Sequence, residues 1–343
     1  MKKDRESDMA MNSIAFAGNI IVDSVKTVES WPERGMLARI LKLTRGVGGS
    51  VPNTAIDLKT LDPAVSVSAI GCVGNDEPGE FAMSAMASRG IDVSRVRRAD
   101  APTSFTDVMT LAETGERTFF NMHGADSLLL PGDVDAANLD CDIFHLGYLL
   151  LLDGMDGEDG EFGTAAARLL ANVRAAGIKT SVDIVSEDSP RFARVVRPAL
   201  KYCDYLIVNE IEGSLATGIP CRDADGRTTP DALAKIAEGL FGLGVREKVV
   251  LHCPEFGLAC DASGNTTVVP SLALPKEWIK GSVGAGDAFC AGMLYATLKG
   301  MSDEEGLRLA SCAAAANLAA PDSISGALPL PATLELERRF ARR

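Results

Sequence analysis

A glycine-rich run near the C-terminal end of the chain leads directly into an acidic residue and an apolar helical pattern. The run consists of Gly284, Ala285, Gly286 and Asp287. Glycine lets a backbone approach a ligand closely, and the free N–H groups and positive dipole of a helix N-terminus attract anions. An ionised aspartate beside such an anion can take the proton of an attacking hydroxyl, because in phosphoryl transfer that proton leaves late. The run therefore predicts an anion hole with its own base, and a capped helix start stabilised by an acid is the structural alternative.

A second glycine-rich loop precedes another helical pattern in the first fifth of the chain. It contains Gly48 and Gly49, with Asn53 entering the helix, and Asp23 lies upstream at the end of a short apolar segment. Carboxylates and amides suit polyols, because each hydroxyl both donates and accepts a hydrogen bond. Ligands of open α/β sheets bind at the carboxyl ends of the strands. These residues therefore predict a polyol site at that edge of a sheet.

A third pair of polar residues follows a later apolar segment. Asn209 and Glu212 are three residues apart at a predicted helix start. The pair suits a hydrated Mg²⁺ ion that keeps its waters and touches phosphate, with Glu212 reaching the metal indirectly. An N-cap with a favourable acid in the first turn explains the same pair equally simply. Both interpretations stay open.

The elements that must position these residues follow from the hydrophobic pattern. Short apolar runs predict strands, and longer periodic patterns predict helices. We expect strands over residues 13–17, 66–70, 143–146, 180–184, 205–208 and 248–252, and helices over 52–61, 80–88, 162–176, 189–202, 231–243, 285–298 and 302–319. Continuously apolar strands that alternate with helices favour a parallel sheet covered on both faces. Ser302 with Glu305 predicts a capping box at the start of the last helix.

Two segments stand apart from this alternation. Residues 36–43 and 103–121 have the pattern of β-ribbons, the second with a turn near Glu113, Thr114 and Gly115. We expect them to form a small sheet beside the main one. One α/β domain with a β insertion explains a chain that is about twice the usual domain length.

Composition excludes several classes of partner. The 343 residues carry 34 Lys and Arg against 47 Asp and Glu, a formal charge of −13. Such a surface repels nucleic-acid backbones and anionic membranes, so neither is expected as a partner.

The eight scattered cysteines lack a C-x-x-C pair, which favours reduced thiols and a cytoplasmic location. No apolar run suits a signal peptide or spanning helix, and three widely separated histidines indicate no zinc spacing.

Two familiar nucleotide-binding classes fail on their motifs. A dehydrogenase needs G-x-G-x-x-G between the first strand and its helix, but Gly18 stands alone there and the Gly284 and Gly286 pair lacks the third glycine. A P-loop kinase needs G-x-x-x-x-G-K-[ST], and this string does not occur. Neither class is supported.

The motifs together resemble the ribokinase-like (PfkB) carbohydrate kinase family, from about residue 12 to about residue 331. The G-A-G-D-x-F sequence is the most specific part of this resemblance. The matching pieces are Asp23, the loop from Gly48 to Ala55, the run from Gly71 to Gly79, Gly90-Ile91-Asp92, the pair Asn209 and Glu212, and the run from Gly284 to Phe289.

The resemblance implies a three-layer α/β/α domain with a central, mostly parallel sheet and a small β-sheet lid. The domain would span residues 12–343 after a flexible segment 1–11, and the lid would come from about 20–45 and 100–125. Lids of this family often pair in dimers. A homodimer formed through the lid is therefore expected.

The resemblance also implies a reaction, the ATP-dependent transfer of a γ-phosphoryl group to a hydroxymethyl of a small sugar, fructokinase-like or related. ATP and Mg²⁺ are the implied cofactors. The implied roles are Asp287 as base, the amides of Gly284, Ala285 and Gly286 as anion hole, Asp23, Gly48, Gly49 and Asn53 as substrate ligands, and Asn209, Glu212, His252 and Glu255 around the nucleotide and Mg–phosphate. A nucleoside kinase of the same family and a non-catalytic sugar-binding sensor are the alternatives. A retained base at Asp287 argues against the sensor.

The chain departs from the family pattern at three places. Ser50 and Val51 replace the Lys and Gly of ribokinase proper, so ribose is not the first substrate expected. After the late strand the family often has Thr-x-Gly, and this chain has His252, Cys253, Pro254 and Glu255. Proline removes an N–H, so the phosphate contacts there must differ, and His252 is expected to pack as a strand-end imidazole.

The third departure predicts how the protein responds to monovalent cations. Gly281 stands where the family has an aspartate that helps to hold such a cation beside the anion hole. Because glycine offers no carboxylate, we expect turnover to differ little between K⁺ and Na⁺. Coupled measurement of ADP release in KCl and in NaCl at equal ionic strength checks this. Strong dependence on K⁺ would contradict it.

Overall fold

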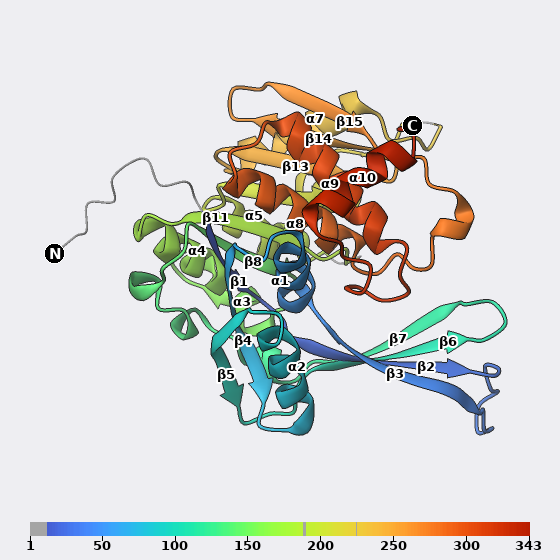
Figure 1. Ribbon diagram of the computed structural model, residues 1–343. Coiled ribbons are helices and arrows are strands. Elements are labelled where there is room, and N and C mark those ends of the chain that lie inside the picture. The colour runs from blue at the N-terminus through green and yellow to red at the C-terminus, as the bar shows by residue number, and fades with distance from the viewer. Residues whose placement is uncertain (1–11, 188–189, 224) are drawn as a thin grey trace.

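A nine-stranded sheet between two layers of helices makes up the larger part of the molecule (Figure 1). The structure is a computed structural model that describes residues 12–187, 190–223 and 225–343, so the expected flexible segment 1–11 lies outside the described residues. In spatial order the strands are β15 (Thr266–Pro270), β14 (Phe256–Asp261), β13 (Lys248–His252), β12 (Tyr205–Asn209), β11 (Lys179–Ile184), β8 (Ile143–Leu149), β1 (Ser13–Ala17), β4 (Ser66–Gly74) and β5 (Asp92–Ala99). Neighbours from β5 to β13 run parallel, and β14 is antiparallel to β13 and β15.

Each face of this sheet is covered by its own helical layer. One face packs against α1 (Ser50–Leu61), α2 (Glu77–Ala87), α8 (Ala285–Leu298) and α9 (Asp303–Asn317), with α10 (Leu330–Arg339) resting on α9. The other packs against α3 (Asp153–Asp156), α4 (Ala165–Ala175), α5 (Phe192–Leu200), α6 (Glu210–Thr217) and α7 (Pro230–Leu243). Strand β1 shows why the strands are apolar throughout, because Ile14 and Phe16 enter one core while Ala15 and Ala17 enter the other. Because both faces of the sheet are buried, successive side chains of a strand are apolar on both sides.

The predicted alternation of strands and helices is confirmed, and so is the fold class. Strands 13–17 and 248–252 and helix 285–298 have the expected bounds, and the other predicted strands and helices are present with ends shifted by a few residues. Residue 189, where one helix was expected to begin, lies outside the described residues. Ser302 and Glu305 form the predicted capping box. Sequence analysis predicted only the start of α6 and missed the β14–β15 hairpin, because these segments are short and give weak periodicity.

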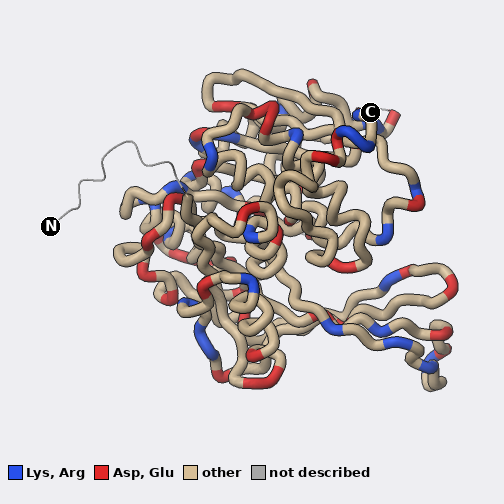
Figure 2. Tube along the Cα trace, viewed as in Figure 1, with Lys and Arg blue, Asp and Glu red and all other residues tan. Residues whose placement is uncertain are grey.

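A separate four-stranded sheet, the lid, projects from one edge of the molecule (Figure 1). Its order is β3 (Ile40–Gly48), β2 (Ile21–Val28), β6 (Phe105–Leu111) and β7 (Arg117–Met122). Strands β6 and β7 turn at the predicted place, where Gly115 has a φ of 72°. Figure 2 shows basic positions along these strands, in a chain that is acidic overall. The two β-ribbons expected beside the main sheet therefore form one small sheet.

Smaller elements complete the chain. They are the hairpin β9 (Glu158–Asp159) and β10 (Gly163–Thr164) and the 3₁₀ turns η1 (Ala125–Leu128), η2 (Pro131–Asp133), η3 (Ala136–Asn138) and η4 (Lys276–Trp278). The eight cysteines form no disulfide. Among the residues that the structure describes, no helix combines the length and the apolar character needed to cross a membrane.

Candidate active site

Three cavities lie in a row where the lid, the carboxyl ends of the central strands and the start of α8 meet. The lid cavity, of about 400 Å³, is lined by Asp23, Gly49 and Asn53. It shares Tyr148 with the central cavity, of about 200 Å³. The α9 cavity, of about 470 Å³, shares His252 and Gly286 with the central one and has mainly apolar walls from α8 and α9. A substrate, a transferred group and a second ligand could therefore lie end to end.

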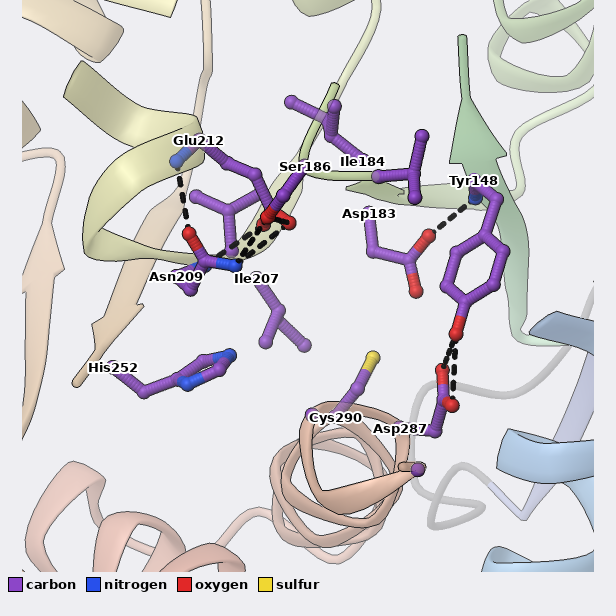
Figure 3. Close-up of a pocket in the computed structure, with 14 residues that line it drawn as sticks. Tyr148, Asp183, Ile184, Ser186, Ile207, Asn209, Glu212, His252, Asp287 and Cys290 are labelled. Atoms are coloured by element: carbon purple, nitrogen blue, oxygen red, sulfur yellow. Dashed lines mark hydrogen bonds between the residues drawn. The ribbon is translucent and has the colours of Figure 1, made fainter. Parts of the chain in front are cut away.

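Asp287 lies in the first turn of α8 and lines the central cavity (Figure 3). Its carboxylate is 4% exposed and accepts hydrogen bonds from the Tyr148 hydroxyl, at 2.8 Å to each oxygen, and from Asn53 Nδ2 at 3.0 Å. Burial, followed by the charge of Asp183, raises the pKa of Asp287 to about 7, while the two hydrogen bonds act in the opposite direction. The unperturbed pKa assumed from the sequence is thus wrong. Near neutral pH the group is divided between carboxylate and acid.

The residues of the predicted anion hole lie at the N-terminus of α8. Gly284 caps the helix with a φ of 81°, and a Cβ there would lie 2.6 Å from Ser323, so only glycine fits against that loop. A Cβ on Gly286 would meet nothing closer than His252 Cε1 at 3.8 Å. The space beside the Gly286 amide is therefore open to the central cavity, as a phosphate group requires. Ala285 lines the neighbouring α9 cavity.

Of the four predicted substrate ligands, Asp23, Gly49 and Asn53 line the lid cavity, whereas Gly48 lies beneath Asp23. Burial raises the pKa of Asp23 to about 6, opposed by a hydrogen bond from the Thr106 side chain. The carboxylate of Asp23 packs on Gly48, where a Cβ would lie 2.3 Å from Oδ2. Gly49, with a φ of 94°, lets the start of α1 approach the Asn19 carbonyl, because a Cβ would lie 2.6 Å from that oxygen. The two glycines thus form the floor under the carboxylate.

Asn53 was expected to bind substrate, and in the structure its side chain bonds Asp287. Its Nδ2 donates to Asp287 and its Oδ1 accepts from Ser323 Oγ at 2.8 Å. The amide group still lines the lid cavity. Asn53 therefore orients the base as well as facing the cavity, a role that sequence reasoning did not assign.

Asn209 and Glu212 form the capping box that the structural alternative described. Asn209 Oδ1 accepts from the amides of Ile211 and Glu212 at 2.9 Å, and Glu212 Oε2 accepts from the Asn209 amide at 2.9 Å. Both side chains also line the central cavity beside Ser186, opposite Asp183 (Figure 3). Burial raises the pKa of Glu212 to about 8 despite the backbone hydrogen bond from Asn209. The carboxylates of Glu212 and Asp183 are hard oxygen donors, which fit a hydrated Mg²⁺ between them.

His252 and Glu255 separate in the structure. The imidazole of His252 packs on the Phe289 ring with 4.6 Å between ring centroids, and burial lowers its pKa to about 4, so it is neutral. Glu255 is exposed and lines none of the three cavities. The turn after β13 closes with Cys253 N donating to Phe256 O, and the Glu255 carboxylate acts on the Cys253 thiol, which lines the α9 cavity. The role of Glu255 beside the phosphates stays a prediction.

Sequence reasoning missed two residues of the central cavity, Tyr148 and Asp183. Tyr148 ends β8 with a φ of 58°, which is uncommon for a residue other than glycine. Its amide donates to Asp183 Oδ1 at 2.5 Å, which fixes the turn and aims the phenol at Asp287. Asp183 is a carboxylate at the end of β11, so the strand-end rule applied to that strand would have found it. Asp23 itself is near the start of β2, so the expectation that it ends a strand is wrong. The strained turn at Tyr148 has no sequence signal.

The tyrosine's influence on the base is directly measurable. In Tyr148→Phe the hydrogen bond that favours the ionised form is lost, so the pKa of Asp287 should rise above about 7. Titration of aspartate side-chain carbons by NMR measures this, and Tyr202→Phe, at a tyrosine that packs on Phe162, is the matched control. An unchanged or lower pKa in Tyr148→Phe would show that the phenol does not stabilise the carboxylate.

Comparisons with solved structures agree with this architecture. The ribokinase of Arabidopsis thaliana, solved with ribose and ATP, superposes with a TM-score of 0.78 at 22% identity, covering 96% of this chain and 99% of that one. A nucleoside kinase of Methanocaldococcus jannaschii gives a TM-score of 0.71 at 17% identity, with 96% and 99% covered. An Escherichia coli protein assigned as a ribokinase, solved with ATP and Mg²⁺, gives 0.74 at 20% identity, with 96% and 100% covered. At these identities the likeness shows the fold.

The sequence comparisons define the family. A ribokinase of Schizosaccharomyces pombe is 24% identical over 337 residues, which cover 96% of this chain and 98% of the relative. The 2-dehydro-3-deoxygluconokinase of Escherichia coli K12 is 26% identical over 278 residues, covering 76% and 84%. The pfkB family carbohydrate kinase profile matches residues 11–330, nearly the whole chain. The chain belongs to the pfkB family of carbohydrate kinases.

Proposed function

We propose that this carbohydrate kinase transfers the γ-phosphoryl group of ATP to a hydroxymethyl of a small sugar acid. The observation that carries the proposal is the position of Asp287, buried between the lid cavity and the open amides at the start of α8. A hydroxyl entering from the lid side meets the base first and the anion hole next. That order is the one an in-line phosphoryl transfer needs.

Each group then has a defined part in the reaction. The substrate oxygen forms a bond to the γ-phosphorus as the bond from that phosphorus to the β-bridging oxygen breaks, and the hydroxyl proton passes to Asp287. Tyr148 and Asn53 hold the carboxylate in place through their hydrogen bonds. The amides near Gly284 and Gly286 receive the negative charge of the phosphoryl oxygens. Mg²⁺, held through water by Glu212 and Asp183, would neutralise the donor phosphates.

The pKa of the base gives the reaction a pH dependence. Because burial raises the pKa of Asp287 to about 7, the carboxylate form that accepts the proton increases as the pH rises through neutrality. A base whose pKa is near the working pH also accepts a proton more strongly than an ordinary aspartate. The apolar α9 cavity, bordered by Phe289 and Leu318, offers room for the base of a nucleotide.

The lid cavity favours an anionic sugar. It is lined by Arg45, Arg89 and Arg117. Arg45 is paired with Glu77 at 2.7 Å, whereas Arg117 donates to the Pro321 carbonyl at 2.8 Å and lies near the Asp322 carboxylate, whose pKa it helps to lower. Arg89 donates to the Ala85 carbonyl at 2.7 Å. Within the described part of the chain, neither Arg89 nor Arg117 forms a salt bridge. Two guanidinium groups that keep further N–H donors beside a sugar site suit a carboxylate on the substrate, because arginine binds carboxylates through paired N–H donors. The relatives that are named 2-dehydro-3-deoxygluconokinases are consistent with such a substrate.

The arginine hypothesis is tested by the change Arg117→Gln. With a 2-dehydro-3-deoxyaldonate as substrate, we expect KM to rise about tenfold or more, since one charge-assisted contact contributes about 1.5–3 kcal/mol. With fructose, KM should change little. Arg39→Gln, an exposed lid arginine outside the cavity, is the control and should behave like the wild type. Equal effects on acidic and neutral sugars would remove the basis for an acid substrate.

The activity itself is tested by Mg-ATP turnover on a panel of sugar acids, fructose, ribose and nucleosides. We expect turnover with a sugar acid and its near abolition in Asp287→Asn, which keeps the shape of the base and removes its proton affinity. Substrate binding, measured by calorimetry, should survive in that variant. Preference for nucleosides would support a nucleoside kinase, the known activity of one structural relative. Saturable binding with no ADP release from any ligand would instead indicate a sugar-binding sensor.

We also propose that two copies pair through their lids. Large apolar side chains cover the lid and its connecting loop, each about half exposed or more: Trp31, Met36, Leu37, Ile40, Leu41, Leu43, Phe119 and Phe120. An apolar patch of this extent is typical of an association surface.

The eight unpaired cysteines suit the reducing cytoplasm, where we expect the protein to work as one domain with its lid.

A further inference from the structure

A second cluster of potential ligands lies immediately behind the reacting groups. His145 on β8, Asp183 at the end of β11 and Cys290 on α8 are all buried, and their ligating atoms lie within 4.8 Å of one another. Asp183 and Cys290 also line the central cavity, and both side chains point into it (Figure 3). This cluster has no motif spacing, because its members come from three separate elements.

The imidazole of His145 has an unused nitrogen that faces the cluster. Its Nδ1 lies 3.0 Å from Ser181 Oγ, within hydrogen-bonding distance. Its Nε2 lies 3.4 Å from Asp183 Oδ2 but makes no hydrogen bond to any residue that the structure describes, and the side chain is 1% exposed. Buried polar atoms without a partner are rare and call for an explanation. When Nδ1 carries the proton and donates it to Ser181, Nε2 presents a lone pair, the arrangement typical of a metal-ligating histidine.

The distances suit tetrahedral coordination. Metal bonds of about 2.0–2.1 Å to nitrogen, 2.0–2.2 Å to oxygen and 2.3 Å to sulfur place the donor atoms about 3.4–3.6 Å apart at tetrahedral angles. The nitrogen of His145 and the oxygen of Asp183 already stand at 3.4 Å. The sulfur of Cys290 lies within 4.8 Å of both, so closure requires a movement of about 1 Å or a little more.

We propose that His145, Asp183 and Cys290 form a binding site for a thiophilic divalent metal ion, with Zn²⁺ as its representative. A nitrogen, a sulfur and one carboxylate oxygen favour Zn²⁺ or Co²⁺ over Mg²⁺, which prefers an all-oxygen set. Three protein ligands leave a fourth position, and the central cavity supplies the space for it. The site is distinct from the Mg²⁺ position between Glu212 and Asp183, although both would use the Asp183 carboxylate.

Occupancy of this site would oppose the proposed reaction. Asp183 Oδ1 accepts a hydrogen bond from the Tyr148 backbone amide, and the Tyr148 hydroxyl donates to Asp287. A metal bound to Asp183 would therefore be connected to the proposed base through the single residue Tyr148. The metal and its fourth ligand would also fill part of a cavity of about 200 Å³ that the transferred group must use. We therefore expect micromolar-range Zn²⁺ to inhibit. The inhibition rests on the proposed function, whereas metal binding does not.

Titration of the reduced, full-length protein with Co²⁺ tests the binding. We expect one equivalent to produce the visible bands of tetrahedral Co²⁺ together with a near-ultraviolet sulfur-to-cobalt charge-transfer band, and Zn²⁺ to bleach both. Cys290→Ser should lose the charge-transfer band, and His145→Gln should weaken affinity at least about tenfold. Cys221→Ser removes the least buried thiol and is the control that should retain the wild-type spectrum.

The possible outcomes separate the two hypotheses. Absence of the charge-transfer band, or its persistence in Cys290→Ser, would overturn the site. Thermal melting of each variant without metal identifies one that fails to fold, and the remaining variant then decides. Co²⁺ binding by a protein that phosphorylates no substrate would sustain the metal site and refute the kinase proposal. Turnover that is insensitive to Zn²⁺, with no Co²⁺ spectrum, would leave the kinase proposal standing and remove the metal site.

Discussion

The structure depends on one buried carboxylate at the start of a helix. Asp287 must lie where a hydroxyl can reach it and where water is largely excluded, and this burial raises its pKa to about 7. Relative to an ordinary aspartate, the ionised form is destabilised by about 4 kcal/mol. The hydrogen bonds from Tyr148 and Asn53 reduce this effect without cancelling it. The base is consequently held in place by neighbours that also limit how far its pKa moves.

The remaining architecture brings those neighbours together. Tyr148 ends a strand of the main sheet, Asn53 lies in α1, and the two meet at α8 because their elements pack around one sheet edge. The loop after α9 joins the same network, since Ser323 donates to Asn53 while its carbonyl accepts from Asn317 Nδ2 at 2.6 Å. The close approach of this loop explains why Gly284 tolerates no side chain. Because these elements contact one another directly, a displacement of any of them would change the position of Asp287.

Local charge also resolves an apparent conflict with composition. The chain has a formal charge of −13, yet each of the two ends of its site is suited to an anion. At one end the positive field comes from backbone amides at the start of α8, and at the other from Arg89 and Arg117 in the lid cavity. The acidic groups between them, Glu212 and Asp287, have raised pKa values because they are buried, so part of their negative charge is absent near neutral pH. Net charge therefore describes the surface and its partners, whereas the site is governed by local groups.

The sequence by itself determined the alternating fold, the lid ribbons and the residues proposed as anion hole and base, because these depend on local signals: hydrophobic period, glycine in left-handed backbone, and an acid in the first turn of a helix. Tertiary structure alone decided the rest. The strained turn at Tyr148, the double use of Asn53 and the meeting of His145 with Cys290 have no signature in local sequence. The position of Glu255 outside the three cavity linings was not predictable for the same reason, since the direction of a side chain after a strand depends on the turn that follows. The pKa of Asp287 likewise required the fold, because desolvation arises from atoms that are distant in the chain and close only in space.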